Sequence, residues 1–266
     1  MDNTLLINKK MTKIEFSLTH SNSVAKIVLN DGKGNILDSI MMNELHQILE
    51  ECSQNATIKL ITIEGAGKHF SFGASVEEHK KENAGMMLKN FHSLFYRISE
   101  MGIPMLAKVS GQCLGGGMEV ALICNFIFAD ATAKFGQPEI ILGVFPPPAS
   151  ILLPLKIGYS RAEELLITGK TISADQAQKM GLVNELFTDK LSLENATEDW
   201  IQKNILPKSA SSLRYAVKAG RIFHNHILSK FLPALEEYYV SQLMNTKDAN
   251  EGINAFLEKR QPEWVG

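Results

Sequence analysis

The sequence lacks the features that mark membrane, secreted and metal-stabilised proteins. No stretch approaches the 18 consecutive apolar residues of a membrane-spanning helix, and residues 1–13 hold no apolar segment as long as that of a signal peptide. There are only three cysteines, Cys52, Cys113 and Cys124, and none form a CxxC pair, so neither a zinc cluster nor a disulfide framework is indicated. We therefore expect a cytoplasmic protein with no membrane segment and no metal.

An excess of charge of one sign is also missing. The 266 residues include 27 Lys and Arg against 29 Asp and Glu, and there is no long basic run of the kind that a nucleic-acid-binding surface needs. Hydrophobic residues make up 45% of the chain, which is enough for a large core in a protein of this length. We expect a globular protein that does not bind nucleic acid.

Short strands alternate with helices over the first two thirds of the chain, which predicts an α/β fold. Residues 14–18 and 23–29 are rich in β-formers and predict a hairpin. Strands are predicted at 59–64, 104–111 and 126–130, and helices at 38–52, with Asp38 as the N-cap, and at 88–101. From about residue 192 strand signals end, and four helical stretches follow at 193–205, 210–222, 227–245 and 248–260.

Two glycine-rich loops each lie between a predicted strand and a helix. In the second loop, GQCLGGGMEV, three glycines open a helix whose first N–H groups have no partner within it, and such groups suit an oxyanion hole. A plain turn is the alternative interpretation of the first loop, GAGKHFSFGAS, and a favourable acid in a first helical turn is the alternative interpretation of Glu119. A nucleotide-binding P-loop is not supported, because the Lys-Ser/Thr pair is absent.

A second acid, Glu139, lies in an otherwise apolar stretch, KFGQPEIILG. Partial burial of a carboxyl raises its pKa towards the range useful for general acid–base catalysis. An acid at the protein surface is the alternative interpretation of this position.

Taken in order, the motifs resemble those of the crotonase (enoyl-CoA hydratase) superfamily. They are GxGxxFxxGA, AKVSGQCLGGGMEVALICNF, AKFGQPEIILG, LLITGKTISADQAQKMGLVNEL and the tail EGINAFLEKRQPEW, and the resemblance runs from about Ile14 to Trp264. It implies a spiral core of repeated ββα units over residues 12–190, after a loose tail at 1–11. Residues 191–266 would then be a helical region that forms a homotrimer or homohexamer.

The resemblance also implies the chemistry. Ala74 and Gly116 would supply the two N–H donors of the oxyanion hole, and Glu119 and Glu139 match the two catalytic glutamates of family hydratases. The substrate would be an acyl-CoA thioester, to which water is added with no cofactor besides the coenzyme A of the substrate. By resemblance Glu119 activates the water and Glu139 delivers a proton, although the spacing does not divide the proton transfers between them.

Further contacts to the substrate are expected from residues beside these motifs. They are Gly73, Gln137, Phe145, Pro146 and Pro147, together with Phe256 and Lys259, which would reach coenzyme A in a neighbouring subunit. The segment GVFPPPAS departs from the usual Gly-rich family sequence, and its prolines predict a stiff, apolar acyl pocket. It resembles the cyclohexa-1,5-diene-1-carbonyl-CoA hydratases of anaerobic aromatic degradation, which implies a cyclic dienoyl-CoA substrate; a neutral rigid loop is the alternative.

Three other functions stay open for a chain with this resemblance. A generic 2-enoyl-CoA hydratase of fatty-acid β-oxidation would share both acids, whereas an enoyl-CoA isomerase needs only one. A non-catalytic RNA-binding member of the fold would need a basic surface, which the charge balance does not offer. A non-catalytic scaffold member would leave both acids without a role. The sequence leaves open the acyl group, the regiochemistry of water addition, the choice between trimer and hexamer, and the pathway.

Overall fold

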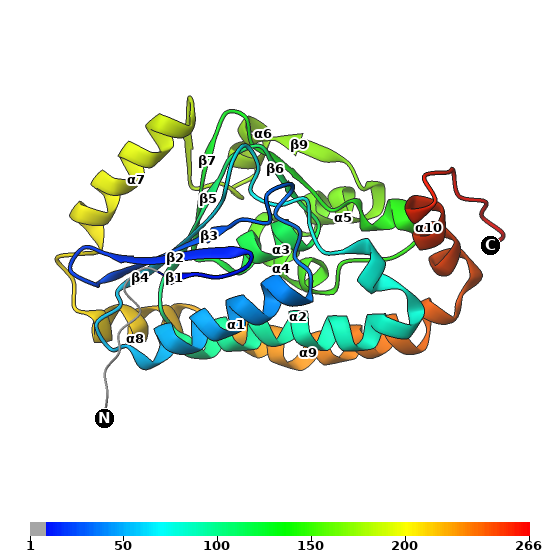
Figure 1. Ribbon diagram of the computed structural model, residues 1–266, viewed down its shortest axis with the longest axis horizontal. Coiled ribbons are helices and arrows are strands. Elements are labelled where there is room, and N and C mark those ends of the chain that lie inside the picture. Colours follow the sequence, from blue (N-terminus) through cyan, green and yellow to red (C-terminus); the bar gives the residue numbers. More distant parts are fainter. Residues whose placement is uncertain (1–8) are drawn as a thin grey trace.

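The computed structural model describes residues 9–266 and confirms a mixed α/β fold with two sheets (Figure 1). The larger sheet has seven strands in the order β1-β2-β3-β4-β5-β7-β10, and the smaller has the order β6-β8-β9. The strands of the larger sheet are β1 (Lys9–Lys10), β2 (Ile14–Thr19), β3 (Val24–Leu29), β4 (Leu60–Gly65), β5 (Met105–Val109), β7 (Phe126–Asp130) and β10 (Glu185–Phe187). Those of the smaller are β6 (Gln112–Leu114), β8 (Lys134–Gly136) and β9 (Thr171–Ser173).

The predicted hairpin is present, and the strands after it are parallel. β2 and β3 pair antiparallel, with Ile14 opposite Leu29, whereas β3, β4, β5, β7 and β10 are parallel neighbours. Parallel neighbours need a crossover segment between them, and such connections bring the loops that follow the strands to one edge of the sheet. Both glycine-rich loops follow strands of this parallel set, after β4 and β5. Most of the expected loose tail lies outside the described residues; of its last positions, Lys9 and Lys10 pair with β2.

Helices cover both faces of the larger sheet. On one face α1, α2 and α9 run side by side along the molecule, with the main hydrophobic core beneath them (Figure 1). On the other face α7 places Leu193 and Ile201 against Leu60, Leu106 and Phe128 of the strands. The helices of the first two thirds of the chain are α1 (Ser39–Gln54), α2 (Lys81–Met101), α3 (Gly116–Ile123), α4 (Pro147–Ile157), α5 (Tyr159–Thr168) and α6 (Ala174–Lys179), with 3-10 turns η1 (Val76–His79) and η2 (Pro138–Leu142).

After β10 the described chain is helical to residue 257. The elements are α7 (Lys190–Asn204), α8 (Ala210–Gly220), α9 (Ile222–Ser241), the 3-10 turn η3 (Leu243–Asn245) and α10 (Lys247–Leu257). α9 continues through Pro233, and α10 lies at the far end of the molecule, where it contacts η1 and η2 (Figure 1). No helix within residues 9–266 is both long and apolar enough to cross a membrane.

Several element boundaries differ from the sequence-based expectation, among them that of α9, which begins at Ile222 instead of residue 227. α2 begins at Lys81, seven residues before the predicted start at Leu88, because its first turns are polar and bury only Ala84 and Met87. The proline segment is not a loop, since Pro147 and Pro148 form the first turn of α4. Proline suits that position because its fixed φ is helical and its missing N–H would have no partner there.

Candidate active site

The two glycine-rich loops lie against each other at the edge of the sheet. Ser71 forms a parallel bridge with Cys113, with the Ser71 N–H donating to Gln112 O and the Leu114 N–H to Ser71 O, both at 3.0 Å. Gly73 has a φ of +107°, and a Cβ there would lie 3.0 Å from Leu114 O and 3.4 Å from Gly116 N. Only glycine allows both this backbone conformation and this approach.

The close approach places the amides of Ala74 and Gly116 together. A Cβ on Gly116 would lie 3.2 Å from the Ala74 nitrogen, and both residues line the same cavity. Gly116 is the first residue of α3, so its N–H has no partner within the helix. Neither amide donates a hydrogen bond to another part of residues 9–266. Two free N–H groups facing one cavity can bind a carbonyl oxygen that gains negative charge.

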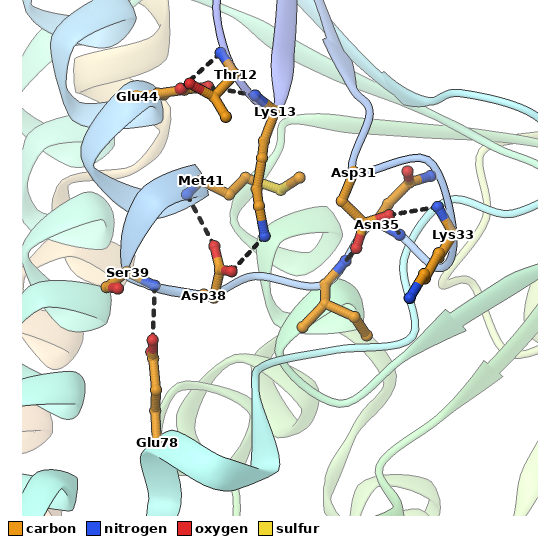
Figure 2. Close-up of polar contacts among 11 residues, drawn as sticks. Thr12, Lys13, Asp31, Lys33, Asn35, Asp38, Ser39, Met41, Glu44 and Glu78 are labelled. Carbon is orange, nitrogen blue, oxygen red and sulfur yellow. Dashed lines mark hydrogen bonds and ion pairs between the residues drawn. The ribbon is translucent and has the colours of Figure 1, made fainter.

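The segment before α1 holds the first loop in place (Figure 2). Asp31 accepts hydrogen bonds from the backbone N–H groups of Lys33, Asn35 and Ile36 at 2.7–2.8 Å, which closes a tight turn. The Asn35 side chain then donates to the carbonyl groups of residues 66, 69 and 70 in the first glycine-rich loop.

Further along the same segment, Leu37 forms a parallel bridge with Ala74. Asp38 caps α1 as predicted, by accepting a hydrogen bond from the Met41 N–H, and also forms an ion pair with Lys13. Glu78, in η1, accepts a hydrogen bond from the Ser39 N–H at 3.1 Å, which ties the start of α1 to the turn that follows Ala74 (Figure 2). These contacts fix the position of the Ala74 amide from both sides.

Glu119 lies in the first turn of α3, and its side chain is only 3% exposed. Its Oε1 accepts a hydrogen bond of 2.8 Å from the Ala149 N–H at the start of α4. Because Pro147 and Pro148 have no N–H, the Ala149 N–H is the first free amide of that helix. The N-termini of two helices therefore lie near this carboxyl, and both favour a negative charge on it.

Glu139 lies in η2 and reaches towards the loop that begins α3. Its Oε1 would be only 2.5 Å from a Cβ on Gly115, a residue with a φ of +49°. In the amide orientation that satisfies both groups, Gln137 Nε2 donates to Glu139 Oε2 at 3.0 Å and to Oε1 at 3.2 Å. Gln137 is fully buried and is not in the cavity wall, and its side chain positions Glu139; its contact with the substrate stays a prediction.

The two carboxyls share one apolar environment. Burial raises the pKa of Glu119 well above its usual value, and the charge of Glu139 raises it further. Burial raises the pKa of Glu139 to about 8. Two close carboxyls release their protons one after the other, as a pair. Such a pair can hold one acid and one base at neutral pH, which is the requirement for adding or removing the elements of water.

A cavity of about 690 Å³ opens in front of these groups. Its volume is in the range of small-molecule sites, and its wall is mostly apolar. The wall includes Gly73, Ala74, Gly115, Gly116, Glu119 and Glu139, together with Ile36, Phe72, Val76, Met87, Leu88, Phe91, Leu114, Ile141, Leu142, Phe145, Pro146, Pro147, Tyr239, Phe256 and Leu257. The site residues predicted at 73, 74, 116, 119, 139, 145, 146 and 147 are thus brought together.

The two predicted residues of the last helical segment are placed differently from each other. Phe256, on α10, is half exposed and lines the cavity of its own chain. Lys259 lies beyond the end of α10, is exposed, and is not in the cavity wall. The contact of either residue with coenzyme A in a neighbouring subunit stays a prediction.

Four polar residues of the cavity wall, Ser75, Glu77, His79 and Tyr239, were not predicted as site residues from the sequence. His79 donates from its Nδ1 to Ser75 O at 2.7 Å, and burial lowers its pKa. Tyr239, on α9, is 1% exposed and lines the same cavity as both glutamates. Tyr239 is 100 residues from the nearer glutamate, in a segment with only a generic helical pattern, so no local signal indicates it.

Comparison with known proteins adds family evidence to this geometry. A family model described as "Enoyl-CoA hydratase/isomerase" matches residues 19–266. The cyclohexa-1,5-dienecarbonyl-CoA hydratase of Thauera aromatica is 41% identical over 247 residues, which is 93% of this chain and 95% of the relative. The 2,3-dehydroadipyl-CoA hydratase of Escherichia coli (strain K12) is 32% identical over 234 residues, 87% of this chain and 91% of the relative.

Solved structures agree with the architecture. An enoyl-CoA hydratase from Mycobacterium avium subsp. paratuberculosis K-10 superposes with a TM-score of 0.84 at 23% identity and covers 97% of this chain and 100% of its own. That likeness shows the fold alone. An enoyl-CoA hydratase from Bacillus anthracis has a TM-score of 0.72 at 31% identity, over 94% of this chain and 98% of its own.

Proposed function

This chain belongs to the enoyl-CoA hydratase/isomerase family, and on that premise we propose that it adds water to a cyclic dienoyl-CoA thioester. The expected crotonase-type α/β fold is confirmed, as is an acyl-CoA hydratase function, which makes the chain a hydro-lyase. The observation that carries the proposed chemistry is the glutamate pair, Glu119 and Glu139, in the wall of a cavity that also contains two unpaired amides.

The reaction starts at the thioester carbonyl. Its oxygen accepts hydrogen bonds from the N–H groups of Ala74 and Gly116, which draws electron density from the conjugated double bond and makes the β-carbon electrophilic. As electrons move onto the oxygen, these hydrogen bonds strengthen, and removing one such donor in other enzymes costs on the order of a hundred- to a thousand-fold in rate. No cofactor besides the coenzyme A of the substrate takes part.

The two glutamates then divide the proton transfers. Burial and the charge of Glu139 raise the pKa of Glu119, but when Glu139 holds the proton of the pair its charge is absent and the Ala149 N–H favours the Glu119 carboxylate. This carboxylate removes a proton from water while the water oxygen attacks the β-carbon. Glu139, with a pKa of about 8, is protonated at neutral pH and delivers its proton to the delocalised enolate. One proton enters the pair and one leaves it, so exchange between the two carboxyls restores the starting state.

The shape of the acyl pocket favours a ring. Phe145, Pro146 and Pro147 form a rigid apolar part of the cavity wall, and Phe145 packs edge-on against Tyr239 with ring centroids 5.3 Å apart. The prolines are held in the first turn of α4, so this wall cannot easily yield to a long flexible chain. The 41% identical relative is named for a cyclic dienoyl-CoA, which supports the same substrate class.

The test compares a cyclic dienoyl-CoA with crotonyl-CoA as substrates of the purified wild-type protein. We expect a kcat/KM at least tenfold higher for cyclohexa-1,5-diene-1-carbonyl-CoA, and no hydration of either by the Glu119→Gln/Glu139→Gln double variant. A preference for crotonyl-CoA would defeat the cyclic assignment but leave a generic 2-enoyl-CoA hydratase. Conversion of a 3-enoyl-CoA without net hydration would point to an isomerase, which needs only one of the two acids.

We also propose that the chain forms a homotrimer or homohexamer in the cytoplasm. Large hydrophobic side chains stay exposed along α8 and α9, among them Tyr215, Ile222, Phe223 and Phe231. Clustered apolar surface of this kind is typical of protein–protein contacts. Analytical ultracentrifugation should give three or six times the chain mass, and Phe223→Glu should shift the protein to monomers. The three cysteines are free and buried, in keeping with a reducing compartment.

A further inference from the structure

The hydroxyl of Tyr239 is a buried polar group of the cavity wall that the mechanism above does not use. The side chain is 1% exposed, it projects from α9 into the wall of the cavity, and its oxygen has no hydrogen-bond partner among the described residues. An unpaired buried hydroxyl destabilises a folded protein, because the group loses its hydrogen bonds to water and gains none. Phenylalanine would fill the same space without that penalty.

Packing does not explain the hydroxyl. The ring of Tyr239 contacts Phe145 edge-on, and this contact needs only the aromatic ring. The adjacent residue, Tyr238, also packs its ring near Phe145, at 5.8 Å, but it is half exposed and does not line the cavity. No described residue is a hydrogen-bond partner of the Tyr239 oxygen, and a molecule bound in the cavity that Tyr239 lines can supply one.

The neighbouring groups indicate what that molecule presents. Besides burial, the charges of Glu139 and Glu119 raise the pKa of Tyr239, so both carboxyls are near the phenol and it remains protonated. The phenol is therefore a hydrogen-bond donor beside an acid–base pair. The reacting oxygen is the atom that must lie between those acids, first as water and then as the hydroxyl of the product.

We propose that the Tyr239 hydroxyl donates a hydrogen bond to the oxygen that is added to the acyl group, so that Tyr239 orients the attacking water and recognises the hydroxylated product. This inference rests on the proposed hydratase function and deepens it by adding a third contact to the water site. The phenol proton is not transferred: Glu119 takes a proton from water, Glu139 gives one to carbon, and Tyr239 holds the oxygen in line with the β-carbon.

The test uses two pairs of CoA thioesters that differ by a single hydroxyl. The first pair is the hydroxylated ring product collected from wild-type turnover, which keeps one ring double bond, and cyclohex-1-ene-1-carbonyl-CoA; the second is 3-hydroxybutyryl-CoA and butyryl-CoA. Dissociation constants are measured by isothermal titration for the wild type, for Tyr239→Phe, and for Tyr238→Phe as the matched control on the same helix. If the wild type hydrates the cyclic substrate faster, the cyclic pair of ligands decides the result; if it hydrates the linear substrate faster, the linear pair does.

For Tyr239→Phe we expect roughly three- to tenfold weaker binding of the hydroxylated ligand and unchanged binding of its partner, the range for loss of one neutral hydrogen bond. kcat for hydration should fall by at least tenfold, while the thermal midpoint stays level or rises because an unpaired hydroxyl is removed. Tyr238→Phe should behave as the wild type.

Equal effects on both ligands, or no effect on either, would overturn the role of Tyr239, because a purely structural residue cannot distinguish ligands that differ by one hydroxyl. Failure of the proposed function gives a different result: in that case the wild type itself hydrates no enoyl-CoA of either class. If the wild type is active and Tyr239→Phe matches it in kcat and in both dissociation constants, only the role of Tyr239 is lost.

Discussion

Replacing Glu139 by glutamine should remove a pH-dependent loss of stability that the active site imposes on the fold. Burial raises the pKa of Glu139 from 4.5 to about 8. A carboxyl with a raised pKa keeps its proton in the folded protein at pH values where the unfolded chain has already lost it. The unfolded state then binds fewer protons, so the stability of the wild type decreases as the pH rises from about 4.5 to about 8.

The size of this effect follows from the same two pKa values. A rise from 4.5 to about 8 corresponds to about 5 kcal/mol if all of it is expressed as stability. Glu139 keeps partial contact with the cavity, where water reduces the penalty, so we expect roughly half of that value. For a chain of this size, a change of about 2 kcal/mol moves the thermal midpoint by roughly 4–8 °C.

The assay is thermal unfolding of the wild type and Glu139→Gln between pH 5 and pH 9 at one fixed protein concentration. At pH 5 the two midpoints should nearly coincide, because the wild-type carboxyl is protonated and resembles the amide. At pH 9 the variant should be more stable by several degrees. Glu163→Gln, at an exposed acid of α5, is the control and should follow the wild type throughout. Parallel curves for Glu139→Gln and the wild type would show that Glu139 is not held in a desolvated site.

The remaining predictions concern activity. Glu119→Gln should lower the hydration rate by about a hundred- to ten-thousand-fold while acyl-CoA titrations show unchanged binding, as expected for the loss of a general base; near wild-type turnover would exclude Glu119 as that base. Gly115→Ala should lower kcat by roughly a hundredfold, because its Cβ would lie 2.5 Å from Glu139 Oε1. Gly158→Ala is the control: it has a similar positive φ but open space around the Cβ, so it should lose stability and keep its kcat. Equal losses of kcat in both variants would refute the steric argument. In the pH–rate profile, kcat/KM should fall above about pH 8 as Glu139 loses its proton, and a rate that continues to rise to pH 10 would reverse its assignment as the acid.

Features encoded by neighbouring residues could be predicted from the sequence. The hairpin at β2 and β3 follows from two runs of β-formers, and the Asp38 cap follows from an Asx residue before an apolar helix, which the Met41 N–H bond confirms. The short strands β6, β8 and β9 could not be predicted. Each has three residues, too few to show an alternating pattern, and they exist because segments distant in the sequence pair with one another.

The site shows the same division between local and long-range information. The glycine-rich motifs indicated the two loops that bring the amides of Ala74 and Gly116 together, because the φ angles and close approach of these loops require glycine at defined positions. The sequence does not indicate whether Gln137 faces the substrate or its neighbouring acid, since an amide suits either position. Ala149 and Tyr239 reach Glu119 and the cavity only through tertiary packing, across 30 residues or more, so they have no local signature.

Charged side chains outside the cavity wall also affect the site, because they contact the C-terminal end of helix α3. At the N-terminus of α3 lie the free Gly116 amide and Glu119. At its other end, Arg221 donates to the carbonyl groups of Ile123 and Cys124 at 2.6 and 2.8 Å, and Lys156 donates to Cys124 O at 3.2 Å.

Burial lowers the pKa of Lys156 to about 8 and also lowers that of Arg221. Neither cation is in an ion pair with an acid in the described part of the chain. The burial of both cations therefore destabilises the folded state, and no carboxylate partner among the described residues offsets this desolvation. The negative end of the α3 dipole, which both cations contact, stabilises their charges instead.

The eight residues of α3 span roughly 12 Å, and at that distance a cation stabilises a negative charge by about 1 kcal/mol at an effective dielectric constant of 20. In the proposed reaction the negative charge moves from Glu119 to the carbonyl oxygen, and both positions are at the N-terminus of α3. The two buried cations at the other end of this short helix therefore stabilise that charge both before and after the transfer.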